Sequence, residues 1–326
     1  MEHCSYMLRG RRYWQVLFFA SILLFYPSAN ASQGHDSYVR AESLIVVVHD
    51  NSSHDSGAYT QGLEFYNGRL FESTGLYGSS TLREVNPTNG SILRSTSLPD
   101  TEFGEGITVI GSEILQLTWK EGIAHRYDLE TFELIENHSY EGEGWGLVFD
   151  GERLIMSDGS SELQFRNATT FELESTVNVT LNGEPLPRIN ELEMFQGVLL
   201  ANIYQEEQIV GIDAHSGVVI WNIDASGLKP DGAGVLNGIA FDSSTNSLWI
   251  TGKLWPNMHN ITFTEPVFED DNSNVSPSPE DTSVTKISSQ LSWIPLSIIF
   301  ALVVTLLAMK LKDNGINPSG GGRLNE

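Results

Sequence analysis

The chain is poor in cysteine, and its only one, Cys4, lies close to the amino terminus. A single cysteine excludes an intramolecular disulfide framework and a metal site built from several thiolates. Whatever part of the chain folds must therefore be held together by its apolar core.

Basic residues are also scarce, with 18 Lys and Arg against 42 Asp and Glu and a formal net charge of -24. This balance argues against a nucleic-acid-binding protein, because such proteins use Lys and Arg to release the counterions of the phosphates. The hydrophobic fraction of 40% excludes a wholly disordered chain and is typical of a globular one.

Two long apolar runs interrupt this acidic chain, and the first indicates secretion. Three arginines among residues 9–12 precede the apolar run 16–25, and Ala29-Asn30-Ala31 follows it. A basic region, a short apolar core and an A-x-A sequence form the layout of a signal peptide, which we predict over residues 1–31. An uncleaved membrane anchor is the alternative, although the run is short for one.

The second run, residues 287–309, is uncharged and long enough to cross a bilayer, which takes about 20 apolar residues. Lys310 and Lys312 follow it, and positive charge favours the cytoplasmic side. We therefore predict one transmembrane helix over residues 291–309 and a cytoplasmic tail over residues 310–326. The acidic, Ser- and Pro-rich residues 265–290 are predicted to form a solvated stalk.

N-glycosylation sequons are frequent in this chain. They stand at Asn30, Asn51, Asn89, Asn137, Asn167, Asn178, Asn260 and Asn274, of which the first would be removed with the signal peptide. Such a density suits a glycosylated luminal or extracellular surface. Together these features predict a single-pass type I membrane protein of the secretory pathway, with its folded domain luminal or extracellular.

The folded domain, predicted over residues 32–264, contains an internal repeat. Similar segments begin at residues 61, 105, 145, 190 and 237, and their second positions (62, 106, 146, 191 and 238) are 44, 40, 45 and 47 residues apart. Each continues with a turn and further short apolar segments. Four short strands in 40 to 47 residues are typical of one propeller blade, so we predict an all-β, five-bladed β-propeller.

The fifth unit lacks an obvious fourth strand after Ile261, while the apolar run 44–48 precedes the first unit. We expect this run to supply the missing strand, because joining both ends of the chain in one blade would close the ring and hide its edges. A β-sandwich is the rival fold, but it does not account for five similar units.

The repeat also predicts where side chains gather. First strands open at Gln61, Glu105, Trp145, Asn190 and Asn237, and second strands close at Gly75, Trp119, Gly159, Tyr204 and Lys253. Antiparallel neighbours place the start of one strand beside the end of the next, so both sets should lie at one mouth of the channel. The residues at these positions differ between units while the adjacent apolar positions repeat, which indicates a pocket for a small molecule or a peptide terminus. The alternative is that the aromatic residues belong to the core and the lysine is solvated.

At these residues the chain resembles the plant-type glutaminyl-peptide cyclotransferases, which are five-bladed propellers. The resemblance spans roughly residues 55–262 and rests on Tyr59-Thr60-Gln61-Gly62, Phe103-Gly104-Glu105-Gly106, Leu117-Thr118-Trp119-Lys120, Glu143-Gly144-Trp145-Gly146, Ile189-Asn190-Glu191-Leu192 and Thr251-Gly252-Lys253. It implies a catalytic acid/base, Glu105, and substrate contacts at Gln61, Trp119, Trp145, Asn190 and Lys253, with Phe103 beside them. This chain has Tyr204 where the plant enzymes usually have tryptophan, which bears on the width of the pocket.

The resemblance implies that the α-amine of an N-terminal glutamine attacks its own side-chain amide, giving pyroglutamate and ammonia. The partners are then peptides or proteins with N-terminal Gln, and we expect a monomer that needs no cofactor. We hypothesise that Glu105 moves the protons and that burial beside Trp119 and Trp145 raises its pKa. Lys253 would stabilise the developing oxyanion.

Two other functions remain open from the residues alone: a non-enzymatic propeller ectodomain that binds a ligand or partner protein, and a propeller hydrolase or lactonase with an acidic metal channel. The eight histidines show no H-x-x-H or H-E-x-x-H spacing, which argues against metal catalysis. His35, His49 and His54 each precede Asp and are predicted to form solvated surface pairs. A structural Ca²⁺ in the channel stays open because of Glu64, Glu191 and Glu193.

Overall fold

The structure of the protein is a computed structural model that describes residues 38–266. The predicted signal peptide, transmembrane helix and tail, and nearly all of the stalk, lie outside the described residues. All the regular structure of residues 38–266 is β-strand, in 22 strands. Over the same residues there is no helix of the length and hydrophobicity that a membrane crossing requires.

Three sheets consist of four antiparallel strands each, hydrogen-bonded in sequence order. The first comprises β2 (Thr60–Tyr66), β3 (Arg69–Thr74), β4 (Thr81–Val85) and β5 (Ile92–Ser97). The second comprises β6 (Gly104–Ile110), β7 (Glu113–Thr118), β8 (Ile123–Asp128) and β9 (Leu134–Ser139). The third comprises β10 (Leu147–Phe149), β11 (Arg153–Ser157), β12 (Glu162–Asn167) and β13 (Leu173–Asn178).

The remaining strands form one larger sheet with a short β-hairpin attached to it. In spatial order its strands are β16 (Ile189–Phe195), β17 (Val198–Ile203), β18 (Gln208–Asp213), β19 (Val218–Asp224), β1 (Glu42–Ser53), β22 (Asn257–Thr264), β21 (Ser247–Gly252) and β20 (Leu236–Asp242). The hairpin, β14 (Thr180–Leu181) and β15 (Glu184–Pro185), pairs with β19.

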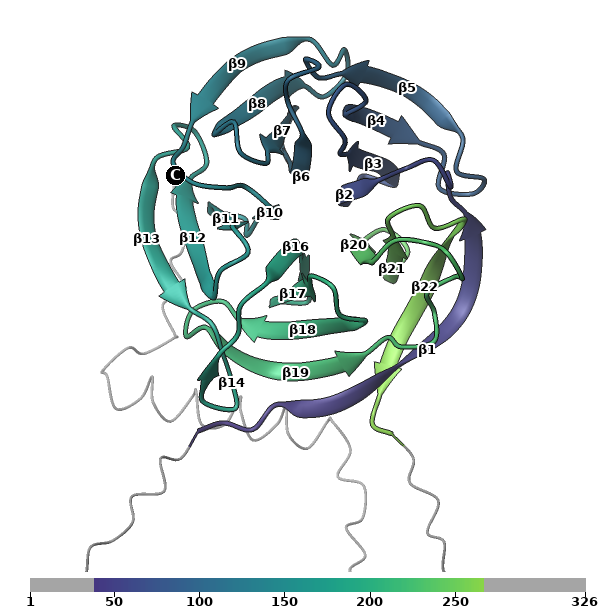
Figure 1. Ribbon diagram of the computed structural model, residues 1–326, viewed down its shortest axis with the longest axis vertical. Coiled ribbons are helices and arrows are strands. Elements are labelled where there is room, and N and C mark those ends of the chain that lie inside the picture. The colour runs from purple at the N-terminus through teal and green to yellow at the C-terminus, as the bar shows by residue number, and fades with distance from the viewer. Residues whose placement is uncertain (1–37, 267–326) are drawn as a thin grey trace, which may run out of the picture. The chain divides into compact units, whose positions relative to one another are not determined.

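The sheets surround a common centre, with β2, β6, β10, β16 and β20 innermost (Figure 1). Each innermost strand contacts the next, and β20 contacts β2. Glycine at the repeat's second position permits this approach: a Cβ on Gly62 would lie 2.6 Å from the backbone nitrogen of Ile107, and one on Gly106 would lie 2.6 Å from that of Leu147. The repeated glycine is therefore explained by strand packing.

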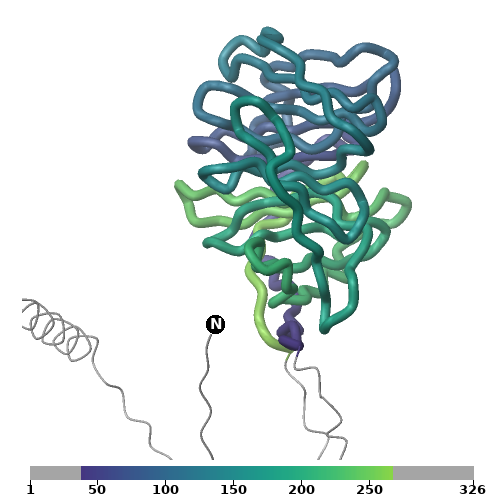
Figure 2. Tube along the Cα trace, turned by 90° about the vertical axis from the view of Figure 1, so that its left-hand side faces the viewer, coloured from purple at the N-terminus to yellow at the C-terminus, as the bar shows by residue number. Residues whose placement is uncertain are grey.

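The ends of the described chain meet in one sheet. β1 runs antiparallel to β22, with Val46 opposite Phe263, which confirms that residues 44–48 add a strand to the last unit. Figure 2 shows this purple segment beside the yellow-green end of the described chain. β1 also pairs in parallel with β19, Leu44 lying opposite Ile223, and this pairing was not predicted. It arises because the long β1 extends past β22 and covers the outer edge of β19.

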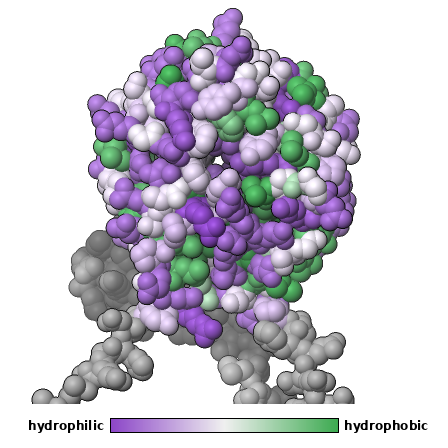
Figure 3. Space-filling view, in the orientation of Figure 1, coloured by the Kyte–Doolittle hydropathy of each residue, from purple (hydrophilic) through white to green (hydrophobic). Residues whose placement is uncertain are grey.

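Burial falls from the inner strands to the outer ones. Along β3 nearly every residue is buried, whereas β5 at the outside of the same sheet is mostly exposed. The face seen in Figure 3 is largely hydrophilic, and its apolar residues form small separate patches. The apolar residues that hold the fold therefore lie between neighbouring sheets, where each sheet buries the face of the next.

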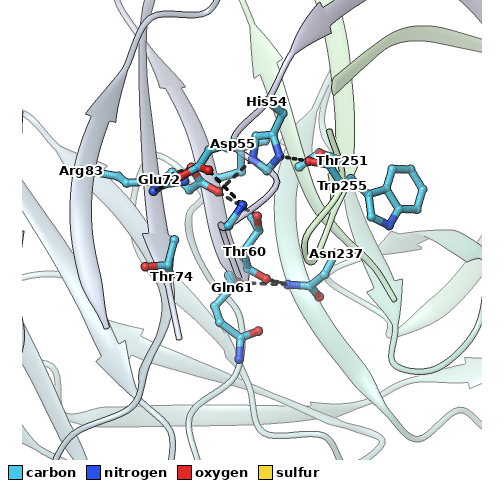
Figure 4. Close-up of polar contacts among 12 residues, drawn as sticks. His54, Asp55, Thr60, Gln61, Glu72, Thr74, Arg83, Asn237, Thr251 and Trp255 are labelled. Carbon is cyan, nitrogen blue, oxygen red and sulfur yellow. Dashed lines mark hydrogen bonds and ion pairs between the residues drawn. The ribbon is translucent and has the colours of Figure 1, made fainter. Parts of the chain in front are cut away.

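A buried polar network lies between the first sheet and the two segments that contain His54 and Trp255 (Figure 4). Glu72 accepts hydrogen bonds from Thr60 Oγ1 (2.7 Å), Arg83 Nη2 (2.7 Å) and His54 Nε2 (3.0 Å). His54 Nδ1 lies 2.7 Å from the carbonyl oxygen of Trp255. Because a carboxylate and a carbonyl only accept, both ring nitrogens donate and the imidazole is protonated.

This network corrects the prediction for one of the histidines. His54 is 8% exposed and not solvated, because the chain turns inward after β1 and seats the ring between two sheets. His49 is exposed, as expected, and contacts Thr262. His35 lies outside the described residues.

Candidate functional site

One pocket of about 190 Å³ collects the eight residues to which the sequence analysis assigned a catalytic or substrate-binding role. It is lined by Tyr59, Gln61, Phe103, Glu105, Trp119, Trp145, Asn190, Tyr204 and Lys253. Only Tyr59 in this set was not proposed from the sequence, although it stands in one of the segments that carry the family resemblance.

The strand ends explain why residues so far apart in sequence meet. Gln61, Glu105 and Asn190 stand at or near the starts of β2, β6 and β16. Trp119 follows β7 directly and Lys253 follows β21. Starts of first strands and ends of second strands thus share one end of the ring, as the antiparallel pairing predicts.

Two of the five positions at which second strands close, Gly75 and Gly159, are glycines because aromatic side chains occupy the space beside them. A Cβ on Gly75 would lie 2.1 Å from the ring of Phe103. A Cβ on Gly159 would lie 2.6 Å from Cζ2 of Trp145, and Gly159 also has a φ of +80°. The absence of side chains at these two positions therefore makes room for two walls of the pocket.

Asn237 was expected at the mouth but does not line the pocket. It is fully buried, and its Nδ2 donates to the carbonyl oxygens of Thr60 (3.0 Å) and Gln61 (3.3 Å). Figure 4 shows this amide turned toward the backbone of β2. Asn237 thus supports the strand that carries Gln61.

Glu105 is the buried acid of the pocket, with 5% of its surface exposed. Its Oε1 accepts a hydrogen bond from Gln61 Nε2 at 2.9 Å. Burial raises the pKa of Glu105 well above its usual value; the positive charge of Lys253 opposes this, and Glu143 and Glu121 reinforce it. The surroundings of this carboxyl group therefore favour its protonated form.

Lys253 is the only cationic residue that lines the pocket, and it is 3% exposed. Burial lowers the pKa of Lys253 to about 8, while Glu105 acts in the opposite direction. Its Nζ lies 4.7 Å from the ring centroid of Tyr59 and 5.6 Å from that of Tyr204. The two rings stabilise the ammonium through cation–π contacts, and among the described ion pairs there is none between Lys253 and Glu105.

Two buried acceptors in the pocket have no hydrogen-bond partner. They are Gln61 Oε1 and Asn190 Oδ1. Buried polar atoms in folded proteins almost always have a partner, so these two carbonyl oxygens are suited to N–H groups of a bound molecule.

The aromatic side chains form two groups on the walls. Phe103 packs edge-on against Trp119, with ring centroids 5.6 Å apart. Trp145 packs edge-on against Tyr204, with centroids 5.4 Å apart. The pocket therefore combines apolar walls with one acid, one cation and two carboxamides, the composition expected of a site that binds a short polar chain end.

Two of the acidic residues that left a Ca²⁺ site open, Glu64 and Glu191, accept hydrogen bonds from backbone N–H groups. Glu191 accepts from the backbone nitrogens of Ile239 (2.9 Å) and Leu63 (3.4 Å), and Glu64 accepts from that of Val109 (3.0 Å). Over residues 38–266 no group of three or more His, Cys, Asp or Glu side chains is arranged to hold a metal ion.

Comparisons with known proteins show which family this chain resembles. The model of the glutamine cyclotransferase family matches residues 19–263. A glutaminyl-peptide cyclotransferase of Arabidopsis thaliana is 36% identical over 217 residues, which are 64% of this chain and 68% of the relative. The crystal structure of Myxococcus xanthus glutaminyl cyclase aligns with a TM-score of 0.65 at 33% identity, covering 69% of this chain and 98% of that one.

Proposed function

Since this chain belongs to the glutamine cyclotransferase family, we propose that it is a glutaminyl-peptide cyclotransferase that converts the N-terminal Gln of peptides or proteins to pyroglutamate. The observation that carries the mechanism is the buried carboxyl group of Glu105, which lines the pocket. A non-enzymatic ectodomain is not favoured, because the family and both relatives are cyclotransferases or cyclases by name.

The reaction joins the α-nitrogen to the side-chain carbonyl carbon and breaks the bond from that carbon to the amide nitrogen. An α-ammonium and an amide together carry five N–H hydrogens; the lactam keeps one, and ammonium leaves with four. Two protons must therefore move from the attacking nitrogen to the leaving one. The attack is intramolecular, so the pocket needs only to hold the ring-closing conformer and move these protons.

We assign both proton transfers to Glu105. A substrate α-ammonium has an ordinary pKa of about 7.7 to 8.0. Because burial raises the pKa of Glu105, the transfer from the ammonium to its carboxylate is less unfavourable than it would be in water. The protonated acid then delivers a proton to the departing nitrogen. The hydrogen bond from Gln61 occupies Oε1, which leaves Oε2 for the substrate.

Lys253 is assigned to the oxygen that becomes negative when the amine attacks. An ammonium in a water-poor pocket stabilises such charge more strongly than it would in bulk water. The unpartnered oxygens of Gln61 and Asn190 would accept N–H groups of the substrate amine or amide. Trp119, Trp145 and Tyr204 would exclude water and pack against the glutamine methylenes.

We further propose that the fold is a five-bladed β-propeller. The three four-stranded sheets would be three blades, and the larger sheet would be two blades that β1 joins. Five innermost strands in contact around one centre support this architecture.

The membrane topology predicted from the sequence is retained as a proposal: a signal peptide (1–31), a propeller domain (32–264), a stalk (265–290), a transmembrane helix (291–309) and a cytoplasmic tail (310–326). Among the described sequons, the asparagines at 51, 89, 137 and 178 are exposed and those at 167 and 260 are half-buried. The exposed ones suit a glycosylated luminal or extracellular domain. The hydrophilic face in Figure 3 suits a monomer. Endoglycosidase treatment and protease protection of the tagged full-length chain in membranes test this topology.

The activity is tested with a dipeptide that begins with glutamine. The wild type should release ammonia with or without a chelator, and the Glu105→Gln variant should be slower by about 10²- to 10⁴-fold, since it keeps the shape of the side chain without the acid. Near-normal turnover by Glu105→Gln would refute the assignment of the proton transfers. Activity lost to the chelator would refute a cofactor-free reaction.

A further inference from the structure

Glu143 lies beside the pocket in the loop before β10, and it joins two of the pocket walls. Its Oε2 accepts a hydrogen bond from Trp119 Nε1 at 2.8 Å and from Trp145 Nε1 at 3.0 Å. Trp119 follows β7 of the second sheet, while Trp145 precedes β10 of the third. One carboxylate oxygen thus links indoles that belong to neighbouring sheets.

The aromatic and cation–π contacts of the two indoles are made to different neighbours. Trp119 packs against Phe103, and Lys120 Nζ lies 3.8 Å from its ring centroid. Trp145 packs against Tyr204. Each indole thus packs against a neighbour of its own. A backbone hydrogen bond from Gly144 N to the carbonyl oxygen of Trp119 (2.9 Å) joins the two segments, and the hydrogen bonds of Glu143 join the indole rings themselves.

A carboxylate is suited to this role. An ionised acceptor forms hydrogen bonds about twice as strong as a neutral one, and one carboxylate oxygen has lone pairs for two donors. Partial burial alone would raise the pKa of Glu143, but the two indole N–H groups and Lys120 lower it. The second oxygen, Oε1, lies 3.6 Å from Lys120 Nζ, and the Glu143 side chain is 40% exposed.

We propose that Glu143 is a positioning residue for cyclisation, which holds the indoles of Trp119 and Trp145 at the separation that the ring-closing conformer of the substrate requires. The proposal rests on the proposed cyclotransferase function. Glu143 does not line the pocket, so it does not touch the reacting atoms and acts from outside the pocket. It holds the two indoles in place, and its negative charge adds to the raised pKa of Glu105. Because ring closure depends on the conformer held between these walls, a shift of about 1 Å would cost about 10²-fold in rate.

Two conservative variants of the full-length chain separate the effect of the length of the Glu143 side chain from the effect of its charge. E143Q keeps an acceptor oxygen at the same reach without the charge, and E143D keeps the charge but withdraws the oxygen. We expect E143D to lose about 10- to 100-fold in kcat with the dipeptide, at a smaller change in KM, and E143Q to lose less than about fivefold. The exposed Glu141 in the same loop provides the matched controls E141D and E141Q, which should behave as the wild type does.

The near-ultraviolet circular dichroism of the tryptophans gives a readout that does not depend on activity. E143D should change this spectrum and E143Q should preserve it. The proposal is overturned if E143D is as active as the wild type, if E143Q is impaired as strongly as E143D, or if neither variant changes the spectrum. A wild type that releases no ammonia would instead refute the proposed function, and the spectra would still test whether Glu143 holds the indoles.

Discussion

Replacing Glu72 by Gln should destabilise the domain strongly while leaving the shape of the side chain intact. The Glu72 carboxylate is fully buried and accepts from His54, Thr60 and Arg83. The amide of a glutamine would place an N–H group against these donors and leave two buried cations without their shared anion. Removing one partner of a buried ion pair typically costs about 3 to 5 kcal/mol.

The shift in proton affinity gives a second, independent magnitude. Burial alone would raise the pKa of Glu72, but His54, Arg83 and Thr60 together lower it from 4.5 to about 2. Since a tenfold change in proton affinity is worth about 1.4 kcal/mol, ionised Glu72 stabilises the fold by about 3 kcal/mol. For a domain of this size that free energy corresponds to a Tm lower by about 6 to 12 °C in the variant.

The sign of the pH dependence follows from the direction of the shift. A carboxyl group with a lowered folded-state pKa stabilises the fold fully above its ordinary value of 4.5, and this contribution is lost as pH falls toward about 2. The difference in unfolding free energy between wild type and Glu72→Gln should therefore be largest at neutral pH and should shrink on acidification below about pH 4.5. Denaturant titrations at several pH values measure this difference directly.

Glu206 provides the matched control. Its pair with Arg188 has the same 2.7 Å distance as the Glu72–Arg83 pair, but both side chains are 45% exposed. Exposed pairs contribute about 0 to 1 kcal/mol, so Glu206→Gln should leave stability nearly unchanged. A Glu72→Gln cost below about 1 kcal/mol, or one that does not vary with pH, would refute the reasoning from burial.

Three further predictions concern single residues. Burial alone lowers the pKa of His54, but the carboxylate of Glu72 and the carbonyl of Trp255 raise it, and the net result is a pKa above 6.5. The stability that the protonated ring contributes is therefore lost as pH rises through this raised value. Denaturant titrations should show that His54→Gln abolishes this pH-dependent loss. Gly159→Ala should displace the indole of Trp145 and reduce kcat/KM by at least about tenfold. The control is Gly151→Ala, because Gly151 also has a positive φ but has open space around it. This control should lower stability and leave activity unchanged. If the oxyanion needs protonated Lys253, kcat of the wild type should fall as pH rises through about 8. The Lys253→Met variant should be slow at every pH and should not show this decline. The same decline of kcat in Lys253→Met would contradict the assignment.

The repeat allowed much of the pocket to be predicted from the sequence. Strand order within a unit depends on local alternation and turns, so equal positions in successive units occupy equal places around the centre. The sequence alone therefore predicts that five residues lie together, and all five line one pocket: Gln61, Glu105, Trp119, Asn190 and Lys253. The fourth strand of the last unit was also predicted from the sequence, because a sheet edge left unpaired there would need a strand from elsewhere in the chain.

Only the tertiary structure decided which side chains reach between sheets. Glu143 and His54 stand outside the strands that repeat, so nothing in the periodicity indicates that one binds two indoles and the other lies buried beside Glu72. Asn237 occupies a repeat position yet turns toward the backbone of β2. Such directions depend on contacts between residues far apart in the chain, and a pattern of local spacing carries no information about them.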